Sequence, residues 1–254
     1  MYAICKLSIV PLRSEPTDCS EMVSQVLFGE IMEITEVKES WSKVVLQNDS
    51  YEGWIDSKQI TPIEQEEFVA LQKRNQILCT DLVEHLTNCK HELMMIPIGA
   101  ELTFLSVPTL NQDNFVFEGE VASEKQPKDN LINTAFMFLN APYLWGGKTP
   151  FGIDCSGFSQ MVYKLNGYQI PRDAYQQAGL GENLSFIEES EPGDLAFFDN
   201  DEGRITHVGI IMKDNYIIHA HGKVRIDRID HLGILNVDTG RHTHKLRVIK
   251  RIVE

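Results

Sequence analysis

Cys155 stands out in this chain because of the residues around it. A helix is predicted directly after it, since apolar residues recur there with helical spacing. Asp154 suits the N-cap of that helix, and Gly167 suits its end. Cys155 would then lie in the first turn, where unpaired N–H groups and the positive end of the helix dipole favour a nucleophilic thiolate. The apolar residues are Phe158, Met161, Val162 and Leu165.

Such a thiolate needs a base, and the base needs a group that orients its ring. The segment 207–220 consists of two apolar runs around the short polar stretch 213–215, a pattern that predicts a β-hairpin. With a three-residue turn, Gly209 faces His219. His207 then lies diagonally across from His219 on the same face of the sheet, within reach of a hydrogen bond.

The orienting group has a second candidate in the same hairpin. The predicted register places His221 opposite His207, so the residues alone leave His219 and His221 both open. A shift of one residue in the turn would move both to the other face. His231, His242 and His244 lie in polar C-terminal sequence and are interpreted as ordinary surface or core histidines.

Length and charge limit the classes of function. The chain has 254 residues, enough for two or three domains, and its 43% apolar and 24% charged residues are typical of a soluble globular protein. A net charge of −14 argues against nucleic acid and anionic membranes as partners. No apolar run approaches the ~20 residues of a membrane span, and no basic leader precedes an apolar run. We therefore expect a cytoplasmic protein, unless a leader has been removed.

Five cysteines, an odd number, carry no zinc-finger or Cys-x-x-Cys spacing. This predicts free thiols in a reducing compartment, with no metal site and no cofactor. Cys79 and Cys89 lie in a segment with helical spacing and are interpreted as core or surface thiols.

The chain is predicted to have three parts. Residues 1–62 contain short strands at the spacing of a small β-barrel. Residues 63–124 are interpreted as a second, atypical module with a helical insertion, because apolar residues take helical spacing across 63–90. The polar, Pro-containing stretch 123–130 is the best boundary, and 125–254 form the third part.

The first part resembles bacterial SH3-like domains, and the second part, 63–124, is interpreted as a second, atypical SH3-like module. The matching pieces of the first part, in order, are Leu-Arg-Ser-Glu-Pro (12–16), Phe-Gly-Glu (28–30), Trp-Ser-Lys-Val (41–44) and Tyr-Glu-Gly-Trp-Ile (51–55). The third part resembles the NlpC/P60 family of papain-like cysteine peptidases across 131–254. Its matching pieces include Tyr-Leu-Trp-Gly-Gly (143–147), Asp-Cys-Ser-Gly-Phe (154–158), Pro-Arg-Asp (171–173), Pro-Gly-Asp-Leu-Ala-Phe-Phe (192–198), His-Val-Gly-Ile (207–210) and Ile-His-Ala (218–220). The resemblance implies an α+β protein in which SH3-like barrels precede a papain-like domain.

The family resemblance also assigns roles around the thiol. It implies Cys155 as nucleophile, His207 as base and His219 rather than His221 as the third polar residue. Tyr143 matches the family's active-site tyrosine, whose phenol would stabilise the oxyanion. The N–H of Cys155, at the helix start, is a plausible second donor.

The implied substrate is a bacterial cell-wall stem peptide, cut between γ-D-Glu and meso-diaminopimelate or Lys. Enzymes of this arrangement favour peptides with a free N-terminal L-Ala. Asp154 matches the family residue that binds this amine, and Ser156 its neighbour. An acidic residue of the first SH3-like domain, Glu21 with Glu15 as its rival, and Tyr51 would close the amine pocket. Arg172 is a candidate for the D-Glu α-carboxylate, with a structural ion pair as the alternative.

Two other interpretations remain. The same dyad could act on intact peptidoglycan, as a lytic hydrolase or amidase. Alternatively, the papain-like part could be an inactive binding module, against which the intact Cys, His, His set argues. The absence of an export signal favours the recycling of imported peptides over lysis. The sequence does not indicate the oligomeric state.

Overall fold

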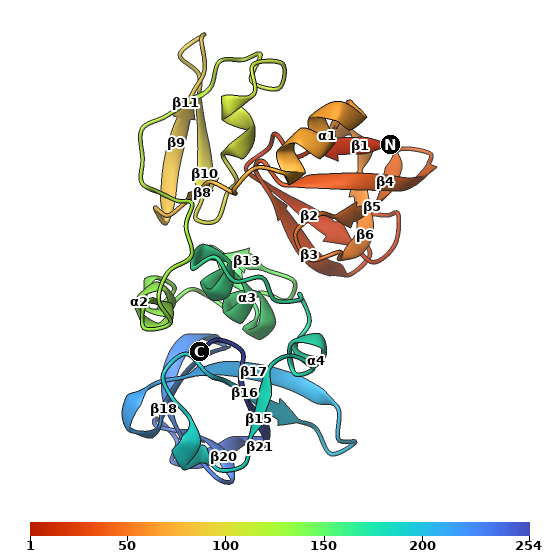
Figure 1. Ribbon diagram of the computed structural model, residues 1–254. Coiled ribbons are helices and arrows are strands. Elements are labelled where there is room, and N and C mark those ends of the chain that lie inside the picture. The colour runs from red at the N-terminus through yellow and green to blue at the C-terminus, as the bar shows by residue number, and fades with distance from the viewer. The chain divides into compact units, whose positions relative to one another are not determined.

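The computed structural model describes residues 1–254 (Figure 1). The chain divides into two compact units, Met1–Glu124 and Lys125–Glu254, here called unit 1 and unit 2. The division falls within the polar stretch 123–130. None of the helices combines the length and the apolar character needed to cross a bilayer.

Seven strands of unit 1 form one antiparallel sheet in the spatial order β3-β2-β6-β5-β4-β1-β7. Apolar residues alternate along β2 and β5, which gives the curled sheet one buried face. Val10, Leu12, Val44 and Ile55 pack inside it. The small barrel expected over the first part of the chain is therefore present. Its elements are β1 (Tyr2–Ile4), β2 (Ile9–Arg13), β3 (Met22–Leu27), β4 (Ile31–Lys38), β5 (Trp41–Leu46), β6 (Glu52–Asp56), the 3₁₀ turn η1 (Ser57–Gln59) and β7 (Thr61–Ile63).

The rest of unit 1 has less helix than the sequence predicts. The helix expected across 63–90 is wrong beyond Gln72, and Cys79 lies in a strand instead. The polar run 73–76 offers a helix no apolar side to bury, and the residues after it pair as strands. The strands form a three-stranded sheet, β10-β9-β11, and a two-stranded one, β12-β8. The elements are α1 (Gln65–Gln72), β8 (Leu78–Cys79), β9 (Val83–Thr87), β10 (Leu93–Pro97), η2 (Thr103–Ser106), β11 (Val116–Phe117) and β12 (Val121–Ala122).

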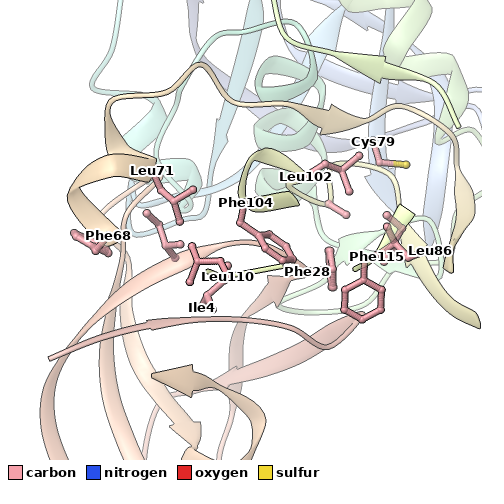
Figure 2. Packing of buried hydrophobic residues seen from close by; sticks show 13 residues of the cluster. Ile4, Phe28, Phe68, Leu71, Cys79, Leu86, Leu102, Phe104, Leu110 and Phe115 are labelled. Carbon is pink, nitrogen blue, oxygen red and sulfur yellow. The ribbon is translucent and has the colours of Figure 1, made fainter. Parts of the chain in front are cut away.

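One hydrophobic core joins the two halves of unit 1 (Figure 2). Phe28, from the turn between β3 and β4, packs against Phe104 with ring centroids 5.3 Å apart. It meets Phe115 edge to face at 6.0 Å. Phe68 and Leu71 of α1 belong to the same cluster. Because burial of a large apolar side chain stabilises by roughly 1.5–3 kcal/mol, these shared contacts bind the halves into one folding unit.

Unit 2 is built on a second antiparallel sheet, in the order β15-β21-β16-β17-β18-β19-β20. A further pairing of β20 with β21 closes six of its strands into a barrel, which Figure 1 shows beside α2 and α3. Helix α3 packs against β17 and β18, and α2 packs against α3. The elements are α2 (Asn130–Met137), β13 (Lys148–Thr149), β14 (Gly152–Ile153), α3 (Cys155–Leu165), α4 (Ala174–Gln177), β15 (Glu182–Leu184), η3 (Ile187–Glu189), β16 (Leu195–Asp199), β17 (Ile205–Ile211), η4 (Lys213–Asn215), β18 (Tyr216–His221), β19 (Lys223–Asp230), β20 (Gly233–Asn236) and β21 (Arg241–Arg251).

The junction within unit 1 depends on Gly29. Its φ of +82° lies in the left-handed region, and its N–H donates to the Cys5 carbonyl at 2.8 Å. The neighbouring Phe28 carbonyl accepts the N–H of Glu101 at 2.7 Å. A Cβ on Gly29 would lie 1.7 Å from the Glu101 carbonyl oxygen, so the backbones approach too closely for any side chain.

We expect Gly29→Ala to lower the unfolding free energy of unit 1 by more than about 2 kcal/mol, since it adds a clash to the left-handed strain. Gly203→Ala is the matched control. It has a similar φ of +75° and nothing within 4 Å of the added methyl, so about 1 kcal/mol is expected there. Calorimetric unfolding measures both, and equal losses would contradict the close approach.

Candidate active site

Cys155 is the first residue of α3 and is only 6% exposed. Burial, followed by the neighbouring Asp154 carboxylate, raises the pKa of its thiol to about 12. A hydrogen bond from the backbone of Val208, the Arg172 guanidinium and the backbone of Ser156 lower that pKa without cancelling the rise. The helix start was expected to favour a thiolate, but the pKa of this buried thiol is raised, not lowered. The sulfur needs a base to take its proton.

The Asp154 carboxylate explains why the helix start gives so little help. It caps α3, as predicted, because Oδ1 accepts the Gly157 N–H at 2.7 Å. Oδ2 accepts the Gly146 N–H at 2.8 Å from the loop before β13. The positive end of the helix dipole is thus already neutralised by a carboxylate adjacent to the sulfur.

Arg172 pairs with the same carboxylate. Its Nη1 and Nη2 donate to the two oxygens of Asp154 at 3.0 and 2.6 Å, and Nη1 also donates to Ser156 Oγ at 2.9 Å. Arg172 is 1% exposed. These are the contacts of a structural ion pair, the alternative left open for Arg172, and they leave no guanidinium surface for a substrate carboxylate. A substrate amine at Asp154 would have to displace one of four close donors.

The hairpin has the predicted register. Gly209 pairs with His219 across β17 and β18, and η4 occupies the turn. His207 Nε2 and His219 Nδ1 lie 2.8 Å apart, as the diagonal geometry requires. Both rings are buried, with His207 5% and His219 0% exposed. His221, the rival orienting group, is exposed, and its ring centroid is 6.5 Å from that of His207.

Beyond His219, the polar chain continues into β19, which the sequence did not indicate. His219 Nε2 lies 3.0 Å from Asp227 Oδ2, and Arg225 donates to both oxygens of Asp227. Arg225 and Asp227 are two residues apart and so share one face of a strand. The two-residue spacing of Arg225 and Asp227 was the only signal in the sequence. It does not reveal that β19 pairs with β18, the pairing that brings Asp227 to His219.

Burial, followed by electrostatic interactions with the neighbouring His219, His244 and His221 rings, lowers the pKa of His207 well below its usual value. Burial also lowers the pKa of His219, although Asp227 opposes this. Burial would raise the pKa of Asp227, but hydrogen bonds from His219, Arg225 and Val237 hold it well below its usual range. The directions of these shifts favour a thiol, two neutral imidazoles and an ionised carboxylate in the resting site.

His244 was interpreted as an ordinary surface or core histidine, yet it lies against the predicted base. Its ring stacks on that of His207 with centroids 4.1 Å apart and planes at 25°. Burial and the nearby His219 and His221 lower its pKa to about 4, so it stacks as a neutral ring. Strand β21 carries it there through a long-range pairing, and no motif near position 244 reveals this.

Tyr143 lies on the loop that precedes β13 and is 36% exposed. Its N–H donates to the Gly222 carbonyl at 3.0 Å, and it forms an isolated parallel bridge with Ile153. Burial and the nearby Cys155 and Asp154 raise the pKa of its phenol to about 12. The phenol is therefore a hydrogen-bond donor at neutral pH. Its role in stabilising an oxyanion, like that of the Cys155 N–H, stays a prediction.

Tyr51 and Glu21, the predicted wall of the amine pocket, belong to unit 1. Tyr51 packs against the barrel core, and Glu21 lies on the exposed stretch before β3. Their contact with substrate remains a prediction. No group of three or more His, Cys, Asp or Glu side chains is arranged to hold a metal ion. The arrangement in unit 2 suits acyl transfer, with a sulfur nucleophile and an imidazole that accepts and returns its proton.

Comparisons with known proteins agree with this geometry. Residues 140–241 match the NlpC/P60 family, and residues 12–60 match the bacterial dipeptidyl-peptidase SH3 domain. The gamma-D-glutamyl-L-lysine dipeptidyl-peptidase of Bacillus subtilis is 32% identical over 219 residues, which cover 80% of this chain and 74% of that protein. The Bacillus cereus protein of the same name is 30% identical over 234 residues, which cover 80% of this chain and 68% of its own.

A solved structure shows the same fold. The crystal structure of an NlpC/P60 family protein from Bacillus cereus superposes with a TM-score of 0.82 at 24% identity and covers all of both chains. The predicted α+β fold class, a papain-like domain preceded by SH3-like barrels, is confirmed for the papain-like domain and the first barrel. The second SH3-like module expected over residues 63–124 stays a prediction. With relatives of this identity over four fifths of its length, the chain belongs to the NlpC/P60 family of cysteine peptidases.

Proposed function

We propose that the protein hydrolyses the bond between γ-D-Glu and the L-diamino acid, Lys or meso-diaminopimelate, of cell-wall stem peptides. The observation that carries this proposal is the similarity to two gamma-D-glutamyl-L-lysine dipeptidyl-peptidases across both units. The activity in those names is that of the two relatives, and its transfer to this chain is our proposal. The thiol, imidazole and phenol of unit 2 supply chemistry that such a reaction needs.

In the proposed reaction, Cys155 attacks the γ-carbonyl carbon while its proton passes to His207. The oxyanion is stabilised by the Tyr143 phenol and the Cys155 N–H. His207 then gives its proton to the departing α-amine of the diamino acid, which leaves a thioester on Cys155. His207 next takes a proton from the water that attacks the thioester and gives it to the departing sulfur, which restores the thiol and neutral His207. The γ-carboxylic acid is released and loses its own proton to solvent.

The finer part of the proposal concerns the end of the peptide that carries the amine. A dipeptidyl-peptidase releases the first two residues of a chain, so a free N-terminus is part of what it recognises. We propose a free L-Ala ammonium as that group. A closed pocket for an ammonium requires carboxylate partners, for which Asp154 and Glu21 are the candidates, and the hydroxyl groups of Ser156 and Tyr51 are candidate neighbours of the same amine. The expected setting is cytoplasmic recycling of free peptides.

Digestion of L-Ala-γ-D-Glu-L-Lys and of whole sacculi in parallel, with mass spectrometry of the products, tests the function. L-Ala-γ-D-Glu and free Lys are expected from the tripeptide. Release from sacculi alone would favour the alternative, a hydrolase of intact peptidoglycan.

Replacement of the sulfur should remove the activity. We expect Cys155→Ala to lower kcat by at least about 10⁴-fold, because loss of one member of a nucleophile–base unit removes nearly all of its effect. The matched control is Cys89→Ala, which removes an exposed thiol in unit 1 and should leave kcat unchanged. The rate of tripeptide hydrolysis is measured for both purified variants. Turnover by Cys155→Ala would exclude the sulfur from the mechanism.

Acetylation of the L-Ala amine tests the ammonium pocket. We expect kcat/KM for the acetylated tripeptide to fall by at least about 100-fold. Acetylation removes the positive charge and adds bulk at the closed end of the proposed pocket, and breaking a buried charge pair costs about 3–5 kcal/mol. The free and acetylated tripeptides are compared at one pH with the wild-type protein. Equal rates would place no carboxylate at the amine and would favour the lytic alternative.

The low pKa of His207 predicts the acid side of the pH profile. A base acts only when neutral, and a lowered pKa keeps His207 neutral to lower pH, so kcat/KM should stay constant as pH falls through 6.5. Titration of the substrate does not change kcat/KM near pH 6.5, because its carboxyl groups titrate near ~4 and its amines near ~8 or above. An acid limb centred at or above pH 6.5 would contradict the burial of this base.

A further inference from the structure

Asp227 is a buried carboxylate with four hydrogen-bond donors. Oδ2 faces His219 Nε2 at 3.0 Å and accepts Arg225 Nε–H at 2.7 Å. Oδ1 accepts Arg225 Nη2–H and the Val237 N–H, each at 2.9 Å. Asp227 is 0% exposed, and an ionised carboxylate can only accept hydrogen bonds.

This fact settles which nitrogen of each histidine carries the proton. Because Asp227 accepts, His219 Nε2 must donate, and the neutral His219 ring then has a lone pair at Nδ1. His207 Nε2, 2.8 Å from that lone pair, must therefore donate its own N–H. The neutral His207 ring is left with its lone pair at Nδ1, the one ring nitrogen able to receive the thiol proton.

We propose that Asp227 is a positioning residue that fixes the tautomers of His219 and His207 in series, so that Nδ1 of His207 is held ready as the proton acceptor. The inference rests on the proposed function, in which His207 is the base. As His207 gains the proton at Nδ1, both of its nitrogens become donors, and the Nε2–H bond to His219 needs no rearrangement. The charge that develops on His207 faces, through His219, a fixed carboxylate.

Arg225 sets the position of the carboxylate itself. Its fork of Nε and Nη2 holds both oxygens of Asp227, and Nη2 also reaches Asp238 Oδ2 at 2.8 Å. The bidentate contact leaves the plane of the carboxylate no freedom to rotate away from His219. A second Asp–His pair on β19 and β21 joins Asp230 to His242 at 2.9 Å, with side chains about two-fifths exposed, whereas Asp227 is fully buried. It offers an internal control.

The tautomers can be measured in the unmodified full-length protein. Long-range ¹H–¹⁵N correlation spectra of ¹⁵N-labelled protein distinguish protonated from unprotonated ring nitrogens, and His207→Ala and His219→Ala spectra assign the two rings. We expect both rings to carry their proton at Nε2 near pH 7. A proton at Nδ1 of neutral His207 would overturn the proposal, whatever the substrate.

The second arm is kinetic. In Asp227→Asn, one oxygen becomes an NH₂ group, which opposes an Arg225 N–H in either orientation of the amide. In one orientation it also faces His219 Nε2 and in the other the Val237 N–H, so the tautomer of His219 is no longer fixed. We expect kcat to fall at least about tenfold with KM nearly unchanged, a smaller loss than the ~10⁴ seen when a carboxylate that directly contacts a catalytic His is replaced. Asp230→Asn, the same change at the exposed pair, should leave both constants unchanged.

The outcomes separate the two claims. A wild-type protein without activity on the tripeptide defeats the proposed function, and the spectra then judge the tautomers alone. An active wild type with Asp227→Asn as fast as Asp230→Asn defeats the positioning role. If Asp227→Asn does not fold, the spectra of the native protein still decide, because they need no variant of Asp227.

Discussion

The contacts of the Asp154 carboxylate shape the rest of the site. This one buried carboxylate caps α3, accepts the Gly146 N–H from the loop before β13 and pairs with Arg172. Loss of one partner of such a buried pair costs about 3–5 kcal/mol, so the start of α3 and both flanking loops are held together. Burial of Cys155 raises the pKa of its thiol most, and the Asp154 charge beside it adds to the rise. The packing and the carboxylate that position the sulfur therefore both disfavour the thiolate, and activation must come from elsewhere.

Sequence reasoning succeeded where local rules decide the structure. The N-cap at Asp154 and the apolar spacing after it define α3, and a three-residue turn fixes the β17–β18 register that brings His207 to His219. Sequence reasoning failed where the pairing of distant strands determines which side chains meet. Asp227 and His244 reach the two histidines through β19 and β21, whose pairings close the barrel and leave no trace in residue spacing. The thiolate was mispredicted because dipole arguments ignore the cost of burying a charge.

Unit 1 shows the same limit in its second half. Apolar residues across 63–90 fit a helical period, but only Gln65–Gln72 is helical. Short apolar runs satisfy helix and strand patterns equally well, and tertiary packing selects between them. Here the selection comes from Phe28, whose ring lies in a core made mostly by residues 68–115. The strands β8 and β9 form where they can cover that core, a condition invisible to a window of neighbouring residues.

These constraints together explain how a neutral pair can act as nucleophile and base. If the thiol and His207 are both uncharged at rest, as the directions of their pKa shifts favour, no buried ion pair has to be stabilised before substrate arrives. In the proposed reaction, charge then appears only when the sulfur attacks: on the oxyanion, for which the Tyr143 phenol is the proposed donor, and on His207, which faces His219 and, beyond it, Asp227. A carboxylate placed next to His207 would favour the imidazolium at rest. Placed one ring further away and braced by Arg225, it stabilises the developing charge and leaves His207 neutral in the free enzyme.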